Sequence, residues 1–222
     1  VSGNIGLSGS IPTWLCDVQI LQLGNTGITG PLPTCFTGLT QLELQNLPLT
    51  GTLYPELFRN LSYLVVSGAR LSGGLPATIQ GGADLVLLAM TDSGLSGAIP
   101  AWVGQLPNLT VVELSGNKLT GPIPDFAARS PLAQFSAANN QLSGTLEPLR
   151  NCTNLERLDV ETNKVGGTIP PWLASANLTL LSATNNYLSC SLPRTTLAAG
   201  AHLRILEGNL FSHSSNPLSA MC

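Results

Sequence analysis

Three charged residues in the C-terminal third of the sequence have the spacing of a chemical site. Arg157, Asp159 and Glu161 alternate with apolar residues, so in a β-strand all three side chains would lie on one face. Two carboxylates held side by side are typical of general acid–base catalysis. The same pattern is also typical of a solvated charge cluster. We favour the cluster, because the two histidines, His202 and His213, fall in the irregular end of the chain.

Other kinds of reactive or charged site find little support. The five cysteines form no Cys-x-x-Cys pair, which argues against a zinc or thioredoxin-like motif. No glycine-rich phosphate loop follows a strand and opens a helix. The sequence therefore predicts no enzyme, no metal and no cofactor. With nine Lys and Arg residues and a net charge of −3, neither nucleic acid nor an anionic membrane is an expected partner. No apolar run reaches the roughly 18 residues of a membrane span.

The glycines instead mark a repeat. The phrase Leu-Ser-Gly-Ala-Ile-Pro at residues 95–100 returns as Leu-Thr-Gly-Pro-Ile-Pro at 119–124. Equivalent positions recur every 21 to 24 residues and serve below as reference glycines: Gly9, Gly30, Gly51, Gly73, Gly97, Gly121, Gly144 and Gly167, with Cys190 in the ninth place. From the second unit on, apolar residues recur twelve, nine and seven residues before each reference position, and one lies two residues before every reference position. Such a period predicts stacked coils, each too small to bury a core alone.

Each coil is expected to contribute a short strand. The apolar positions nine and seven residues before the reference glycine share one strand face. Stacking would align these strands about 4.8 Å apart in a parallel sheet. An amide four residues before the glycine could satisfy backbone groups of neighbouring turns, and four units have one: Asn117, Asn140, Asn163 and Asn186. The earlier units have other residues there: Thr26, Leu47, Ala69 and Ser93.

The unit Leu-x-x-Leu-x-Leu-x-x-Asn-x-Leu-[Ser/Thr]-Gly-x-Ile-Pro resembles the plant-specific subtype of the leucine-rich repeat. Residues 109–124, LTVVELSGNKLTGPIP, match it almost letter for letter. The resemblance covers residues 1–193, about nine units with the first truncated. It implies a right-handed solenoid with a parallel sheet on the concave face, a second short strand in each coil and little regular helix. Such repeats occur in plant receptor kinases, receptor-like proteins, polygalacturonase inhibitors and surface antigens of parasitic protozoa.

The two ends of the array differ. The repeat phrase fades near the C-terminus, so we expect residues 194–222 to form a degenerate cap that covers the last coil. Val1 enters inside a unit, and we expect a capping region upstream of it.

The cysteines allow two disulfides. Cys16 and Cys35 lie on adjacent coils and form either a disulfide or two buried thiols. A bond between Cys190 and Cys222 would tie down the cap. Cys152 is left over and is expected to be a small buried apolar residue.

Four Asn-x-Ser/Thr sequons begin at Asn60, Asn108, Asn151 and Asn177. Three of them lie thirteen residues before a reference position, where asparagine also suits the turn ahead of a strand. The alternative interpretation is N-glycosylation of a secreted protein. Together with the possible disulfides, the sequons favour an extracellular or cell-surface location.

The outward strand positions would form a broad concave surface. Its middle coils present an apolar patch: Tyr63, Val65, Leu87, Ala89 and Val111. Beside it lies a mainly acidic area: Glu113, Arg157, Asp159 and Glu161. Exposed apolar patches usually mark partner sites, although apolar residues also simply favour strands. We therefore hypothesise a protein or peptide ligand with an apolar anchor and a basic flank.

A glycan ligand is less favoured. It would use the tryptophans that recur five residues after three of the reference glycines, Trp14, Trp102 and Trp172, which are more typical of packing between coils. The leading prediction is an extracellular recognition module, the ectodomain of a cell-surface protein or part of one. The alternatives are a secreted inhibitor of a foreign hydrolase and a structural surface-coat or adhesion protein. The fold alone does not decide among them, and it predicts no oligomeric state.

Overall fold

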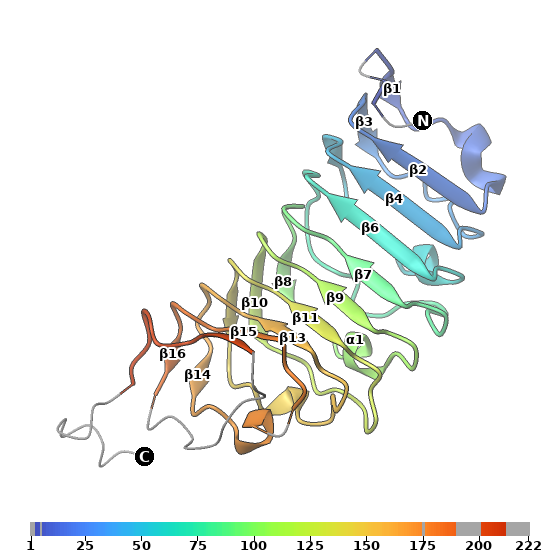
Figure 1. Cartoon of the computed structure of the whole chain (residues 1–222). Helices are drawn as coiled ribbons and strands as arrows, with labels where there is room; N and C mark the ends of the chain where they lie inside the picture. The colour runs from blue at the N-terminus through green and yellow to red at the C-terminus, as the bar shows by residue number, and fades with distance from the viewer. Residues whose placement is uncertain (1–2, 5, 175, 190–200, 212–222) are drawn as a thin grey trace.

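The computed structural model describes residues 3–4, 6–174, 176–189 and 201–211. These residues form an elongated stack of coils (Figure 1). In the described part of the chain, one parallel sheet of nine strands runs the length of the stack. In spatial order its strands are β2 (Ile20–Gly24), β4 (Gln41–Gln45), β6 (Tyr63–Ser67), β7 (Leu87–Ala89), β9 (Val111–Glu113), β11 (Gln134–Ser136), β13 (Arg157–Asp159), β15 (Leu180–Ser182) and β17 (His202–Arg204). The predicted solenoid with a parallel sheet on its concave face is confirmed.

A second set of strands runs along another side of the stack, at or directly before most of the reference glycines. They are β1 (Ser8–Ser10), β3 (Gly27–Pro31), β5 (Leu49–Thr50), β8 (Ser96–Ala98), β10 (Lys118–Pro122), β12 (Gln141–Ser143), β14 (Gly166–Gly167) and β16 (Tyr187–Leu188). They pair in parallel within smaller sheets, in the orders β1-β3-β5, β8-β10-β12 and β14-β16. Gly97 and Gly121 have φ values of 78° and 75°, which side chains rarely tolerate. All eight reference glycines have positive φ, so their recurrence reflects a backbone requirement of these coils.

Helix is scarce, as the repeat pattern predicts. Among the described residues there is one α-helix of four residues, α1 (Trp102–Gln105). The other helical segments of the described residues are short 3₁₀-helices: Thr13–Asp17, Pro55–Phe58, Glu147–Leu149 and Pro171–Ala174. Proline opens two of these turns, Pro55 and Pro171, where its fixed φ suits a helix start and its missing N–H is not needed. No helix in these ranges has the length and apolar character to cross a membrane.

The core is a continuous column of inward side chains. Leu42, Leu64, Leu88 and Val112 lie opposite one another in the sheet register, and all are fully buried. Burying each such side chain contributes about 2 kcal/mol relative to exposing it. Because each coil supplies only a few of them, stability depends on the contact between neighbouring coils.

The predicted asparagine ladder is present. Asn140 donates from Nδ2 to the carbonyl of Leu114 in the preceding coil at 2.9 Å. Its Oδ1 accepts the N–H of Leu119 at 2.9 Å. The same bridging pattern recurs at Asn117, Asn163 and Asn186. Each amide thus satisfies buried backbone groups of two coils, which would be costly to leave unpaired.

Residues 201–211, which lie in the expected cap, continue the coil. Strand β17 pairs in parallel with β15, and Ile205 is buried. Asn209 extends the ladder, since its Nδ2 donates to the Ala183 carbonyl at 2.8 Å. The expected boundary at 193/194 lies outside the described residues.

One of the two expected disulfides lies within the described residues. Cys16 and Cys35 are bonded, with their Cα atoms 5.4 Å apart, and they join the first two turns of the stack. Cys190 and Cys222 lie outside the described residues. Cys152 is a buried free thiol, and burial raises its pKa to about 12 despite a contact with Ser130 that lowers it.

Candidate functional site

The apolar patch is a row across three strands of the concave face. Leu87 of β7 lies opposite Tyr63 of β6 on one side and Val111 of β9 on the other. Tyr63 is 43% exposed, and Leu87, Val111 and Val65 are partly exposed. Ala89 differs from the expectation of an exposed contact, because only 6% of its surface is accessible. Its short side chain lies between Val65 and Glu113 of the neighbouring strands, which stand higher above the sheet.

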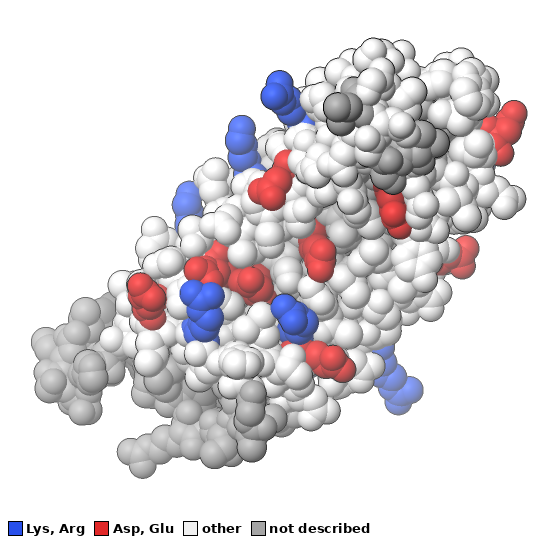
Figure 2. Space-filling view, turned by 45° about the horizontal axis from the view of Figure 1, so that its top comes forward, with Lys and Arg blue, Asp and Glu red and all other residues white. Residues whose placement is uncertain are grey.

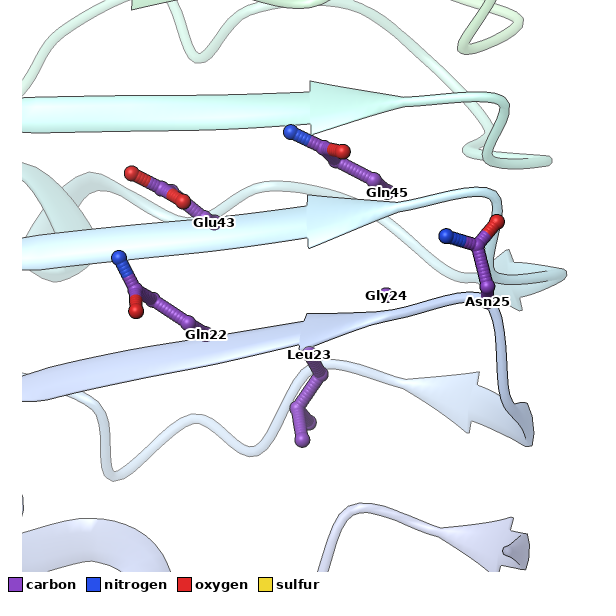
Figure 3. A pocket seen from close by; sticks show the side chains of 6 residues that line it. All are labelled: Gln22, Leu23, Gly24, Asn25, Glu43 and Gln45. Atoms are coloured by element: carbon purple, nitrogen blue, oxygen red, sulfur yellow. The ribbon is translucent and has the colours of Figure 1, made fainter. Parts of the chain in front are cut away.

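The N-terminal side of this row is polar. Around Gly24 the sheet has a shallow hollow, lined by Gln22, Leu23, Gly24, Asn25, Glu43 and Gln45 (Figure 3). It forms because Gly24 has no side chain at a position where Gln45 fills the next strand. Glu43 accepts a hydrogen bond from Gln41 Nε2 at 2.6 Å. Sequence analysis missed this hollow, although a glycine in an outward strand position was the available signal.

The C-terminal side is acidic. Glu113 accepts from Gln134 Nε2 at 2.7 Å. Glu161 accepts from Ser182 Oγ at 3.0 Å and lies 3.6 Å from the Arg204 guanidinium. Acidic side chains gather beside basic ones in the C-terminal half of the molecule (Figure 2). Arg204, a residue that sequence analysis did not include, thus lies beside the acidic residues of this side.

The paired carboxylates do not resemble an acid–base pair. Asp159 Oδ1 accepts the backbone N–H of Glu161 at 3.1 Å, so it caps a local turn. Burial raises the pKa of Asp159, the neighbouring charge of Glu161 raises it further, and the Glu161 N–H and two arginines lower it. His202 is exposed on β17, and His213 lies outside the described residues. Within the described ranges, no group of His, Cys, Asp and Glu residues could hold a metal ion.

The sequon asparagines have structural partners in three of four cases. Their Nδ2 atoms donate to carbonyls of the preceding coil: Asn60 to Thr37 at 3.0 Å, Asn108 to Ala83 at 2.8 Å and Asn151 to Phe126 at 2.8 Å. Asn177 is exposed. Glycosylation stays a prediction, since a turn role accounts for three of the asparagines.

The tryptophans do not form a common surface. Trp102 donates to the Pro76 carbonyl at 2.8 Å and packs edge-on against Phe58, with ring centroids 5.2 Å apart. Trp172 is partly buried against the core. Trp14 is 77% exposed. At Trp102 and Trp172 the geometry is that of packing between coils.

Comparison with known proteins agrees with this architecture. The family model for the leucine-rich repeat matches residues 108–129 and 154–176. No curated protein sequence is similar enough to the chain to count as a match. Among solved structures, the ectodomain of the Arabidopsis thaliana membrane receptor kinase GASSHO1/SCHENGEN3, in complex with CASPARIAN STRIP INTEGRITY FACTOR 2, is 30% identical with a TM-score of 0.80. That alignment covers 92% of this chain and 26% of the ectodomain.

Two further structures show the range of the likeness. The ectodomain of the Arabidopsis receptor kinase HAESA, solved with an IDA peptide hormone ligand, is 27% identical with a TM-score of 0.71, over 95% of this chain and 41% of its own. A plant ice-binding protein is 21% identical with a TM-score of 0.67, over 97% of this chain and 83% of its own, and shows the fold alone. The chain spans less than half of either receptor ectodomain. Its repeat units, its parallel-strand coils and its structural relatives make the chain a leucine-rich repeat protein of the plant-specific repeat subtype.

Proposed function

We propose that the concave face of this chain binds a protein or peptide ligand with an apolar anchor and a basic flank. The observation that carries the proposal is the row Tyr63–Leu87–Val111, which exposes apolar surface between two polar neighbours in the same column, Gln41 on β4 and Gln134 on β11. Such patches on soluble proteins usually mark interaction sites. A ligand that covers Tyr63 and Leu87 would gain about 1–2 kcal/mol from each.

The likeness to receptor ectodomains supports a peptide as the ligand. Both receptor structures described above were solved as complexes, one of them with a peptide hormone. A peptide can satisfy both parts of the face at once. In the sheet register Asp159 is three strands away from Ala89, so Leu87 and Asp159 are separated by about 14 Å across the strands and about 7 Å along them, or roughly 16 Å in all. An extended peptide spans that distance with about five residues. We therefore expect the basic residue of the ligand to follow or precede its apolar anchor by about five positions.

Peptide selection from a random library on the immobilised chain tests the proposal. Selected peptides should share an apolar residue and a basic residue at that spacing. Tyr63→Ala combined with Leu87→Ala should weaken binding at least tenfold, because truncating two anchors removes most of the apolar contact. Ile20→Ala is the matched control, since Ile20 occupies the same column on β2 and is 58% exposed outside the patch. Peptides that bind the double variant as well as the parent chain would sink the proposal.

The proposal also places the chain outside the cell, as a recognition module that catalyses no reaction. Support comes from the Cys16–Cys35 disulfide, which persists in oxidising compartments, and from the exposed sequon at Asn177. Expression through a secretory pathway should give a protein that shifts in mass on deglycosylation. Replacing Asn177 by Gln should remove one shift. A native protein found reduced and unglycosylated in the cytosol would contradict this location.

A further inference from the structure

Four side chains on adjacent coils of the concave face form a square. Asp159 and Glu161 belong to the coil of β13, and Ser182 and Thr184 belong to the coil of β15. Asp159 lies opposite Ser182 in the sheet register, and Glu161 and Thr184 follow two residues later on the same face. Neighbouring corners are about 4.8 Å apart across the coils and about 6.6 Å apart along them. These four residues are the 159/184 square.

A hydrogen bond joins Ser182 and Glu161, which lie on one diagonal of the square. No hydrogen bond joins Asp159 and Thr184, the two residues of the square on the other diagonal. Ser182 Oγ donates to Glu161 Oε2 at 3.0 Å. On the other diagonal, Thr184 is only 4% exposed, yet its Oγ1 has no hydrogen-bond partner in the described part of the chain. Asp159 accepts the Glu161 N–H and forms no ion pair with any described base. A buried hydroxyl without a partner costs about 1–3 kcal/mol, and such groups usually have a functional reason.

Arg204 lies beside the square. It lines a shallow hollow with Thr184 and with its own neighbours Leu203, Ile205, Leu206 and Glu207. Its Nη1 lies 3.6 Å from Glu161 Oε2, and its side chain is 62% exposed. A strong charge-assisted hydrogen bond is shorter, at about 2.7–2.9 Å. The ion pair between Arg204 and Glu161 is therefore weak.

We propose that the 159/184 square binds a primary ammonium group, which displaces Arg204. An ammonium has three donors around one point, which match the Asp159 carboxylate, the Glu161 carboxylate and the Thr184 hydroxyl. A guanidinium is a planar fork that suits a single carboxylate and fits separated acceptors less well. The inference rests on the proposed function in one respect: the ammonium belongs to the basic flank of a peptide ligand.

Titration of the labelled chain with n-butylammonium, followed by nuclear magnetic resonance, tests the site directly. Signals of the square should shift and saturate with n-butylammonium, but not with tetramethylammonium, which has the same charge and no N–H donor. Asp159→Asn and Thr184→Val should each weaken binding about tenfold, the loss expected for a hydrogen bond to a charged group. Arg204→Gln should strengthen binding, because it removes the competing cation. Glu43→Gln, a carboxylate elsewhere on this face, should change nothing.

Thr184→Val keeps the size of the side chain and removes an unpaired hydroxyl, so the fold should be retained. Equal binding of tetramethylammonium, or weaker binding after Arg204→Gln, would overturn the inference. Library-selected peptides that bind Asp159→Asn and Thr184→Val normally would overturn it while leaving the proposed function intact. If butylammonium binds but the library yields no binding peptide, the proposed function is overturned and the ammonium site is kept. The ammonium could be the N-terminal amine of the peptide or a lysine side chain. Acetylating the N-terminal amine removes the first, and replacing lysine by norleucine removes the second.

Discussion

The two halves of the concave sheet are built differently. The first three strands, β2, β4 and β6, have five residues each, whereas the next five, β7 to β15, have three. In Figure 1 the change is visible as broad arrows at the N-terminal end and short ones beyond them. It coincides with the start of the asparagine ladder at Asn117, whose side chain contacts the coil of β7.

The ladder explains the shorter strands. Asn140 donates to the carbonyls of Ala137 and Ala138, at 3.1 and 3.2 Å, directly after β11. An amide that holds these carbonyls favours a turn over further strand pairing. In the first half, Leu47 and Ala69 offer no amide, and pairing continues through Leu44 and Val66 to Gln45 and Ser67. At the same position of the repeat, the turn after the strand is held either by a polar ladder or, where the strand is longer, by apolar packing.

The largest expected effect comes from breaking the ladder. Asn140→Leu removes the acceptor for the Leu119 N–H and the donor to three carbonyls, all in the interior. We expect the free energy of unfolding to fall by about 3–5 kcal/mol, since several buried groups lose their partners. Denaturant unfolding measures the loss.

The opposite substitution, asparagine for leucine at the same position of a coil in the first half, tests the comparison from the other side. Leu47 is 1% exposed in the first half, so Leu47→Asn should also destabilise, by about 2–4 kcal/mol. A gain in stability would mean that the first half merely lacks a ladder, and it would contradict closure by apolar packing.

Features that recur with the repeat period could be predicted from the sequence. Features that depend on the side chains of adjacent strands could not. The column of asparagines from Asn117 to Asn186 follows from counting, and the structure confirms it. Asn209 lies 23 residues after Asn186 and so keeps the period, but the Leu-[Ser/Thr]-Gly phrase that anchored the count is absent after it. The low exposure of Ala89 and the open corner at Thr184 depend on side chains of adjacent strands, which a single repeat does not reveal.

Reduction of the Cys16–Cys35 disulfide should affect the first half alone. Closing a loop over a separation of 19 residues stabilises by about 3 kcal/mol through the unfolded chain. Because each coil contacts only its neighbours, the loss should stay near β2 and β4. Hydrogen exchange of the Cys16→Ser, Cys35→Ser protein should show faster exchange there and unchanged protection at β11 and β13. Uniform loss along the stack would indicate one cooperative unit in place of two distinct halves.

A smaller effect is expected from Asp159 in the second half. Its pKa is raised mainly by burial, so folding favours the protonated acid. That stability is present below the pKa of the unfolded chain and is lost as pH rises through the folded value. Asp159→Asn should therefore stabilise the chain at neutral pH, by less than about 1 kcal/mol because the group is partly exposed. The gain should vanish in acid. Thermal unfolding against pH, with Glu43→Gln as control, checks the sign.

The smallest effect is expected at Cys152. Its thiol is buried in the second half, and a pKa of about 12 leaves almost no thiolate at pH 8. Iodoacetamide should leave it unmodified in the native protein and alkylate it fully in denaturant, as measured by mass spectrometry of the peptide that contains it. Because the residue reacts only when its coil opens, the rate reports local stability. If the ladder holds this half closed, Asn140→Leu should expose Cys152, whereas loss of the Cys16–Cys35 disulfide should not. Equal acceleration by both changes would show that opening spreads across the junction of the two halves.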